Sequence, residues 1–310
     1  MNNISTKKSL KTRIRARWQM YLLLLIPVAY IVIFAYIPMG GLVMAFKDYD
    51  MSKGILGSQW VGLDNFREFF SSYNFKQVLT NTLVVSLYSL AATFPIPILF
   101  ALILNAFPGK RFGKLVQTTT YIPYFISTVV LVGLVMQLLN SRIGIYGTLY
   151  TFFTGNTAPD ILGKAELFKH IYVWSGVWQT TGYNAIIYIA ALAGVDPSLH
   201  EAAKIDGASR FQRLRYVDWP SIVPTATIML ILAAGNIMNV GYEKILLLQN
   251  DLNLSASEVI STYVYKVGLA KGTGDFSLST AIGMFNSVIN FILLVTVNKI
   301  SKKLNGNGIF

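Results

Sequence analysis

The chain has 310 residues, of which 54% are hydrophobic and 13% charged, and it carries a formal net charge of +12 with no cysteine. Soluble domains carry about 25% charged residues, so this composition excludes an ordinary soluble domain. The missing cysteines exclude a disulfide framework, a cysteine-ligated metal site and thiol chemistry.

Apolar runs long enough to cross a bilayer recur along the chain. A helix of about 20 apolar residues spans the hydrocarbon core. The first run lacks a small-residue cleavage site and continues into further apolar sequence, so it is not a cleaved signal peptide. We expect an all-α membrane protein with six transmembrane helices. In chain order the expected spans are 20–37, 80–104, 115–139, 171–194, 223–242 and 279–297.

Positively charged residues gather at one end of these spans. Because cytoplasmic loops carry the excess of Lys and Arg, both termini are expected in the cytoplasm. The expected organisation is a basic cytoplasmic tail (1–18), a six-span membrane domain (19–300) and a cytoplasmic C-terminal tail (301–310). Contact with anionic membrane lipid explains the charge, so no nucleic-acid partner is expected. The cytoplasmic cations are Lys7, Lys8, Lys11, Arg13, Arg15, Arg17, Lys110, Arg111, Lys114, Lys204, Arg210, Arg213, Arg215, Lys299, Lys302 and Lys303.

Helices are also predicted in the outer loops. Phe66, Phe69 and Phe70 share one side of a short amphipathic helix after Gly62, and residues 257–268 form a helix expected at the outer surface. Prolines inside the expected spans predict kinks, since each removes a backbone donor. These prolines are Pro27, Pro95, Pro97 and Pro123.

The chain shows no energy source of its own. The central stretches of the expected spans contain no ionisable residue, which ion-driven carriers usually need. A Walker A sequence is absent, and the nearest fragment, 271–274, lacks the spacing. No carboxylate pair, histidine cluster or ligand set lies at membrane depth, so catalytic and metal-binding residues are not expected. His170 and His200 are interpreted as interfacial or solvated.

The cytoplasmic segment 195–222 is predicted to form two short helices. Asp196-Pro197 is a helix start, and Gly207 ends that helix in a left-handed conformation. Apolar residues recur every three positions from Ala202 to Val217, which fits two helices broken at Gly207 better than one straight helix. Trp219-Pro220 is expected to end the second helix, and Pro224 to open the fifth span.

Residues Glu201–Ala208 read E-A-A-x-x-D-G-A, and Pro220 follows. This order resembles the EAA loop of permease subunits of binding-protein-dependent ABC importers, although Trp219 stands where that family usually has Leu. Other motifs resemble the carbohydrate branch, in particular its larger-substrate oligosaccharide subgroup, and together they extend over 15–303. These motifs are Gly62–Phe66, Tyr121–Pro123, Trp178 with Gly182–Asn184, Gly241–Ile245, and Gly274–Ser277 leading into 280–290.

The resemblance implies a multi-pass subunit of an ATP-driven importer in a bacterial cytoplasmic membrane, forming half of the path for an oligosaccharide or glycan fragment. It implies as partners a second homologous permease, two ATPase subunits and an extracytoplasmic solute-binding protein. ATP and Mg would bind the ATPase subunits, and this chain would hold no cofactor and catalyse no reaction. In the family, the short helix of the loop sits in a groove of the ATPase subunit. The residues implied in this coupling are Glu201, Ala202, Ala203, Asp206, Gly207, Ala208 and Pro220.

Residues on the fourth and fifth spans are candidates for the sugar path, because sugars bind aromatic faces and neutral hydrogen-bonding groups. Asn236, Asn239 and Tyr242 are expected along one side of the fifth helix. The alternative for each residue is structural, since Trp and Tyr favour membrane interfaces and Asn joins helices. The candidates are Trp178, Gln179, Asn184, Asn236, Asn239, Tyr242 and Glu243.

Four alternatives remain open. A permease of the same family could carry a different solute. A secondary carrier is disfavoured by spans without ionisable residues, and an intramembrane enzyme by the lack of a catalytic constellation. A scaffold without transport would not need the arrangement from Glu201 to Pro224.

Overall fold

The computed structural model describes residues 16–107, 109–270 and 274–306. Most of the expected basic tail, the fragment 271–273 and the last residues, 307–310, lie outside them. Helices dominate, with one short strand pair (labels η mark 3-10 and π turns). In chain order the elements are α2 Trp18–Ile31, η1 Val32–Tyr36, α3 Ile37–Met39, η2 Gly40–Phe46, β1 Lys47–Asp48, α4 Gly54–Gly57, β2 Gln59–Trp60, α5 Asp64–Ser71, α6 Phe75–Thr93, α7 Pro95–Ala106, α8 Lys110–Tyr121, η3 Ile122–Phe125, α9 Thr128–Leu138, α10 Ile145–Thr154, α11 Ala165–Ala193, α12 Pro197–Ile205, α13 Arg210–Arg213, η4 Leu214–Asp218, α14 Trp219–Gly235, α15 Tyr242–Leu248, α16 Leu254–Ser257, α17 Ile260–Tyr265, η5 Lys266–Ala270 and α18 Phe276–Asn305.

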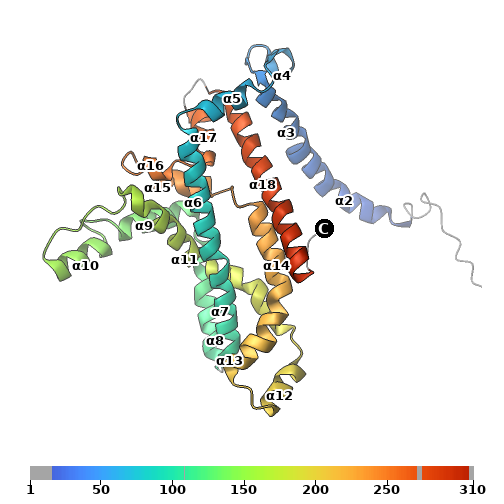
Figure 1. Ribbon diagram of the computed structural model, residues 1–310, viewed down its shortest axis with the longest axis vertical. Helices are drawn as coiled ribbons and strands as arrows, with labels where there is room; N and C mark the ends of the chain where they lie inside the picture. The colour runs from blue at the N-terminus through green and yellow to red at the C-terminus, as the bar shows by residue number, and fades with distance from the viewer. Residues whose placement is uncertain (1–15, 108, 271–273, 307–310) are drawn as a thin grey trace, which may run out of the picture.

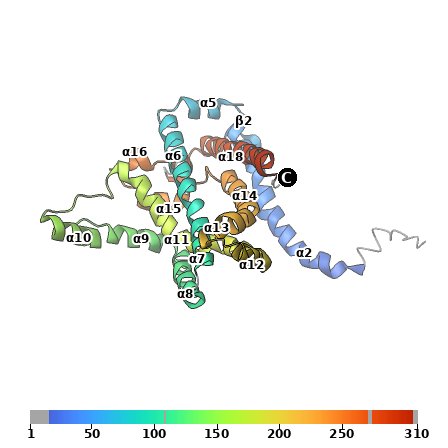
Figure 2. The ribbon, with the colours of Figure 1, turned by 60° about the horizontal axis from the view of Figure 1, so that its bottom comes forward.

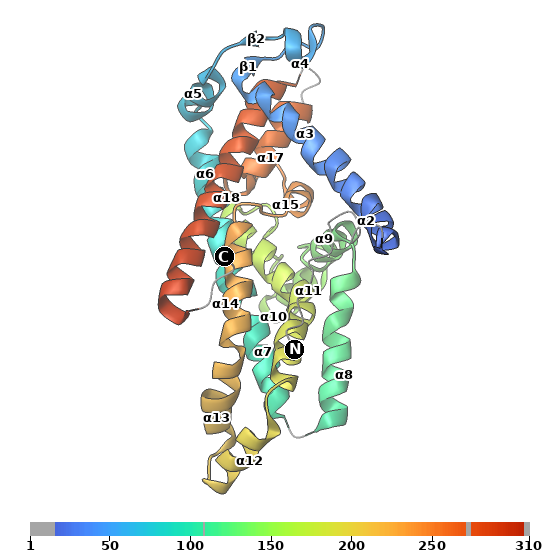
Figure 3. The same cartoon turned by 90° about the vertical axis from the view of Figure 1, so that its right-hand side faces the viewer.

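The molecule is an elongated helical bundle (Figure 1). The α6–α7 rod, α14 and α18 follow its long axis, and α11 packs against α6, α7 and α14. The strand pair β1–β2 lies at one end, and α12 lies at the other (Figure 3). Helices α2 and α10 extend away from the bundle on opposite sides (Figure 2). No residue of α2 is buried.

Four helices in the described residues are long and apolar enough to cross a membrane, at Trp18–Phe46, Phe75–Ala106, Arg210–Gly235 and Phe276–Lys303. They correspond to the first, second, fifth and sixth expected spans. A bent pair, Arg111–Phe125 with Thr128–Leu138, adds a fifth span if it is counted as one. Helix α11 covers the fourth expected span with 29 residues, but it is not among the four helices.

The third expected span is not one straight helix, because its two halves meet at 102°. Pro123 lies in the 3-10 turn before the bend, and Ser127 caps the helix after it. The Gln179 side chain donates to the Ile126 carbonyl oxygen over 3.0 Å. A neighbouring helix thus satisfies a backbone group that the bend removes from the helical ladder.

The fifth expected span ends early, at Gly235 rather than at 242. The chain leaves the helix there, and the Met238 N–H donates to the Asn290 side chain over 2.9 Å. The expectation that Asn236, Asn239 and Tyr242 share one side of a helix is therefore wrong. The Asn290 amide on α18 replaces the carbonyl that would accept this N–H in a continuous helix. The helix can therefore break inside the bundle without leaving the N–H unpaired.

Three apolar clusters hold the described helices together. One centres on Val85, Val173 and Ile245. A second joins α7, α11 and α14 through residues that include Ala101, Ala185 and Ile222. The third packs Phe69, as expected for α5, against residues that include Ile260 and Ile282. The segment 257–268, expected as a helix at the outer surface, is helical over most of its length as α17 and η5. It packs into the bundle, since Ile260 and Thr262 are buried, and its position relative to the membrane stays a prediction.

Close approach of α11 to α8 gives a packing test. A β-carbon at Gly182 would meet the Thr120 carbonyl oxygen, whereas one at Gly113 would meet nothing within 4 Å. We expect Gly182→Ala to destabilise the purified protein by about 1–3 kcal/mol through overpacking. Gly113→Ala should leave the stability unchanged or higher, since Ala favours helices. Thermal unfolding of the two variants in detergent checks this, and an equal effect of both substitutions contradicts the packing interpretation.

Candidate functional site: a capped helix pair and a cavity at the helix break

The first candidate site is the segment around α12. The Asp196 side chain accepts from the Ser198 N–H over 2.9 Å, and Pro197 takes the first helical position, as predicted. This hydrogen bond from the Ser198 backbone holds the pKa of Asp196 below its ordinary value. A charged cap also suits the positive end of the helix dipole.

Gly207 ends α12 as predicted. Its φ is +76°, in the left-handed region that favours glycine. The Gly207 N–H donates to the Lys204 carbonyl and the Ala208 N–H to the Ala203 carbonyl, over 3.1 and 2.8 Å. These two bonds form a Schellman cap. An added β-carbon would meet nothing within 4 Å, so glycine is required for its backbone and not for space.

The second helix begins immediately after this cap. The Ser209 hydroxyl accepts from the Gln212 N–H, and the Gln212 side chain accepts from the Ser209 N–H, forming a capping box. Both helices are thus capped at the turn that joins them, and this turn is short. We infer from these bonds that 196–213 is a stiff unit.

The expected end of this helix at Trp219-Pro220 is wrong. The helix runs on through the π-turn η4 into α14, so the described helix extends from Arg210 to Gly235. The wider π-turn has the Trp219 N–H donate to the Leu214 carbonyl. Pro220 follows directly after this π-turn, so its missing N–H falls where the regular α-helical hydrogen-bond pattern is already interrupted. The Ser221 hydroxyl donates to the Val217 carbonyl and supplies a further partner.

One side of α12 is open. Glu201, Ala202 and Asp206 are exposed, and the side chain of Ile205 is 87% exposed. Ala203 and Ala208 are half-buried, and Pro220 is exposed. Ile205 is an exposed apolar side chain next to small residues. Such a surface is typical of a site that another protein covers.

His200 faces the opposite way, into the bundle. Its Nε2 lies 3.2 Å from Asp218 Oδ1, and its side chain is only 26% exposed. The interpretation of His200 as solvated is therefore wrong, because a buried carboxylate lies within hydrogen-bond distance.

The second candidate site is a cavity of about 590 Å³ in the half of the bundle that lies away from α12 (Figure 3). It lies between the break after α14, the wall formed by α17 and η5, and the first half of α18. Its polar groups are neutral, and its aromatic rings include Tyr242 and Tyr265, whose centroids are 5.8 Å apart. The lining residues are Asn239, Tyr242, Ile260, Ser261, Val264, Tyr265, Gly268, Leu269, Phe276, Ser279, Gly283, Asn286 and Ser287.

Four asparagines form the floor of this region. Asn239 Oδ1 accepts from Asn286 over 2.9 Å and from Asn290 over 3.3 Å. Asn239 itself donates to Asn236 over 2.6 Å. Within the described residues, the buried Asn286 Oδ1 has no hydrogen-bond partner. A free acceptor beside a cavity is suited to a hydroxyl donor.

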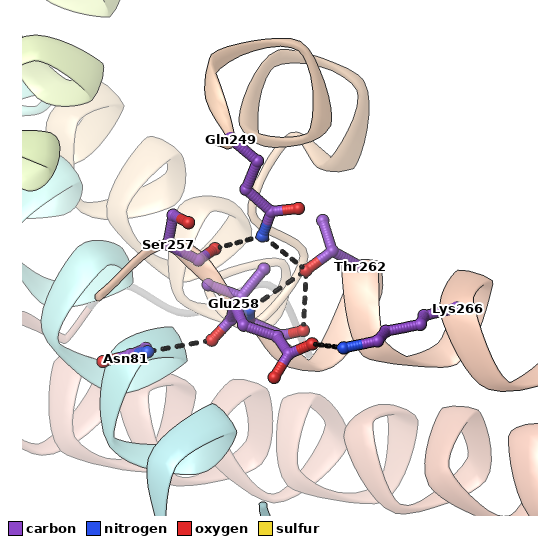
Figure 4. Close-up of polar contacts among 7 residues, drawn as sticks. Asn81, Gln249, Ser257, Glu258, Thr262 and Lys266 are labelled. Carbon is purple, nitrogen blue, oxygen red and sulfur yellow. Dashed lines mark hydrogen bonds and ion pairs between the residues drawn. The ribbon is translucent and has the colours of Figure 1, made fainter. Parts of the chain in front are cut away.

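A polar network fixes the wall of the cavity (Figure 4). Asn81 on α6 donates to the Glu258 carbonyl, and Gln249 donates to Ser257 and Thr262. The Glu258 carboxylate, whose side chain is 5% exposed, pairs with Lys266 at 2.8 Å. These bonds attach the segment before η5 to α6 and hold it in position.

The structure brings only part of the predicted sugar path together. Asn239 and Tyr242 line the cavity. Asn236 does not line it, but its side chain accepts a hydrogen bond from Asn239. Trp178, Gln179 and Asn184 lie on α11 and do not line it, and Gln179 serves the bend of the third span. Glu243 is exposed beside Tyr242 and is also outside the lining.

Sequence reasoning missed the residues of the opposite walls, including Ser261, Tyr265, Asn286 and Ser287. The sequence did contain a sign of these walls, because the sixth expected span also carries two asparagines, Asn286 and Asn290, one helical turn apart. Sequence reasoning also missed the buried Lys244, whose ammonium donates to the Tyr172 carbonyl over 2.9 Å and ties α15 to α11. Across the described ranges, no three His, Cys, Asp or Glu side chains gather as a metal site would require.

Comparisons with known proteins show the family of the chain. A family described as binding-protein-dependent transport system inner membrane component matches residues 94–306. The polygalacturonan/rhamnogalacturonan transport system permease protein YteP of Bacillus subtilis (strain 168) is 40% identical, over 98% of this chain and 94% of its own length. Protein LplB of the same organism is 38% identical, over 96% of this chain and 92% of its own length.

A solved structure also matches almost throughout. It is a chain of a bacterial alginate ABC transporter in complex with an alginate pentasaccharide-bound periplasmic protein. The TM-score is 0.88 at 36% identity, with 97% of this chain and 99% of the other covered.

The left-handed cap at Gly207 yields a prediction. A β-branched residue there costs about 1–2 kcal/mol or more, so Gly207→Val should loosen the orientation of α12. Because the sequence has no cysteine, spin labels at Lys204→Cys and Ile228→Cys report this orientation without background. Their distance distribution should broaden in Gly207→Val and stay narrow in Gly207→Asn, since Asn tolerates the left-handed region. An unchanged distribution in Gly207→Val would show that the cap does not orient α12.

Proposed function

The chain belongs to the family of inner membrane components of binding-protein-dependent transport systems, and on this premise we propose that it forms half of the translocation path for an oligosaccharide or glycan fragment. It is a membrane-embedded ABC importer permease subunit and not itself an enzyme. The observation that carries the proposal is the neutral, aromatic cavity at the helix break, which includes Asn239 and Tyr242.

The chemistry of the cavity supports a sugar ligand. Aromatic rings pack against the CH faces of sugars, and hydroxyl and amide groups serve their hydroxyls. No charged side chain is among the lining residues. Recognition there would depend on the sugar framework, and so would apply to neutral and acidic glycans alike. The names of the relatives, which include polygalacturonan and alginate transport, favour fragments of such polysaccharides.

The coupling role is proposed for α12 and its caps. The exposed side of α12, with Glu201, Ala202 and Ile205, would dock on an ATPase subunit. Ala203, Asp206, Gly207, Ala208 and Pro220 would shape and orient this surface. Support comes from the stiffness of the capped unit, since a lever must not bend when it is moved. ATP and Mg would be held by the ATPase subunits.

The proposed setting is a bacterial cytoplasmic membrane with both termini inside and six spans. Counting α11 and the bent third pair as spans gives six, and α11 with 29 residues has the length, since each helical residue rises about 1.5 Å. The proposed domains are a tail (1–18), the membrane domain (19–300) and a second tail (301–310).

The proposed assembly contains a second homologous permease, two ATPase subunits and an extracytoplasmic solute-binding protein. The similar alginate transporter was solved with a periplasmic protein, which supports the last of these. Helix α2 has no buried residue within this chain, which supports contact of this helix with a partner subunit or with lipid.

Removing polar and aromatic groups from the cavity tests the path. We expect Asn239→Leu with Tyr242→Ala to reduce uptake about tenfold or more, because a lost hydrogen bond and a lost aromatic contact each cost about 0.5–1.5 kcal/mol. The measurement is uptake of labelled pectin and alginate oligosaccharides by the reconstituted complex. The exposed pair Asn156→Leu with Tyr73→Ala is the control. Uptake equal to wild type in the cavity variant would remove this cavity from the path.

The energy source is tested by reconstitution. The purified chain alone should hydrolyse no ATP, and the complete complex should take up oligosaccharide only with ATP inside the vesicles. Robust ATP hydrolysis by the isolated chain, or uptake driven by an ion gradient without ATP, would overturn the proposed function.

A further inference from the structure

Asp218 is a buried carboxylate at a junction of three helices. It is the last residue of the π-turn η4, and it is 4% exposed. Its Oδ1 accepts from Asn105 Nδ2 on α7 over 3.1 Å and lies 3.2 Å from His200 Nε2 on α12. One oxygen atom therefore joins the cytoplasmic helix α12 to α7 and to the start of α14.

Burying this carboxylate is costly unless it is paired. An ionised group taken out of water needs charge or hydrogen-bond partners to offset its lost hydration. Besides Asn105 and His200, the charge of Arg213 acts on the same carboxylate from one π-turn earlier. A π-turn changes the direction of the side chains that follow it and is frequent at functional sites. Packing alone does not call for an acid at this position.

The two sides of this junction differ in how they are held. Helices α7, α11 and α14 share one apolar cluster, which includes Ala101, Tyr188 and Ile222. The hydrogen bonds at the ends of α12, by contrast, stay within 196–213. The helix that starts at Arg210 runs on into α14, so α12 is the part that stands outside the packed block, and the pair His200–Asp218 links it to that block directly.

We propose that Asp218 is a positioning residue that passes the movement of α12 to α7 and α14, with His200 and Asn105 as its two contacts. This rests on the proposed function, since α12 must be moved by an ATPase subunit. Without the junction, α12 would still bind its motor, and ATP would still be hydrolysed, but the membrane helices would follow less closely, because only the turns at the two ends of α12 would pass its movement on.

The test measures sugar taken up per ATP hydrolysed by the reconstituted complex. We expect His200→Ala and Asp218→Asn each to lower this ratio about tenfold, in line with loss of a hydrogen bond to a charged group. The double variant should lower it no further, because the two residues act as one contact. His200→Gln should retain most of the ratio, since its amide donates from a similar position. Lys204→Ala, exposed on the same helix, is the control.

Binding of the ATPase subunits and the basal rate of ATP hydrolysis should stay unchanged in all variants, which separates lost coupling from misfolding. A normal ratio in His200→Ala, or additive losses in the double variant, would overturn the proposal.

Failure of the wild-type complex to import any oligosaccharide with ATP would contradict the proposed function instead. In that case the spin-label pair at Lys204→Cys and Ile228→Cys still tests whether Asp218 orients α12. A distance distribution that broadens in Asp218→Asn supports the junction, and one that stays unchanged refutes it.

Discussion

The structure depends on one constraint: a backbone N–H or C=O at membrane depth must find its partner inside the protein. Two of the spans break, and each break is met by an amide side chain from another helix. Gln179 serves the bend at Ile126, and Asn290 serves the chain at Met238. The cavity lies where the second break draws the chain away from α14. Polar residues in these spans are therefore first of all partners of the backbone, and the ligand space follows from how they are arranged.

Features specified by neighbouring residues could be predicted from the sequence. The start of α12 at Asp196-Pro197 and its end at Gly207 were predicted, because caps are formed by side chains within a few positions. Long apolar runs likewise predicted the four apolar helices, although the first proved longer and the fifth was shifted toward Arg210. The six-span arrangement remains a proposal.

Features that depend on residues far apart in the sequence could not be predicted from it. The end of the fifth helix at Gly235 involves Asn290, and the position of 257–268 involves Thr82 and Asn81 of α6, which bond to the backbone of Ile260 and Glu258. Nor did the sequence reveal that His200 meets Asp218, since the two residues lie on different helices and the turn at Gly207 decides how these helices pack. Pro220 was taken as a helix end because proline usually breaks helices, yet the preceding π-turn admits it. Roles of the site residues in coupling and sugar passage stay predictions.

The anchoring of the first span has a consequence for the order of assembly. Its outer end, η2, packs on α18, and the Tyr49 N–H donates to the Ser277 hydroxyl over 2.8 Å. The remainder of that span, α2, buries nothing within the chain. The contact between Tyr49 and Ser277 joins residues that are 228 positions apart in the sequence, so it forms in a long-range step that waits for α18. Before that step the η2 end of the span has a nearby partner in α5, where the Asn65 side chain donates to the Ala45 carbonyl oxygen over 3.0 Å.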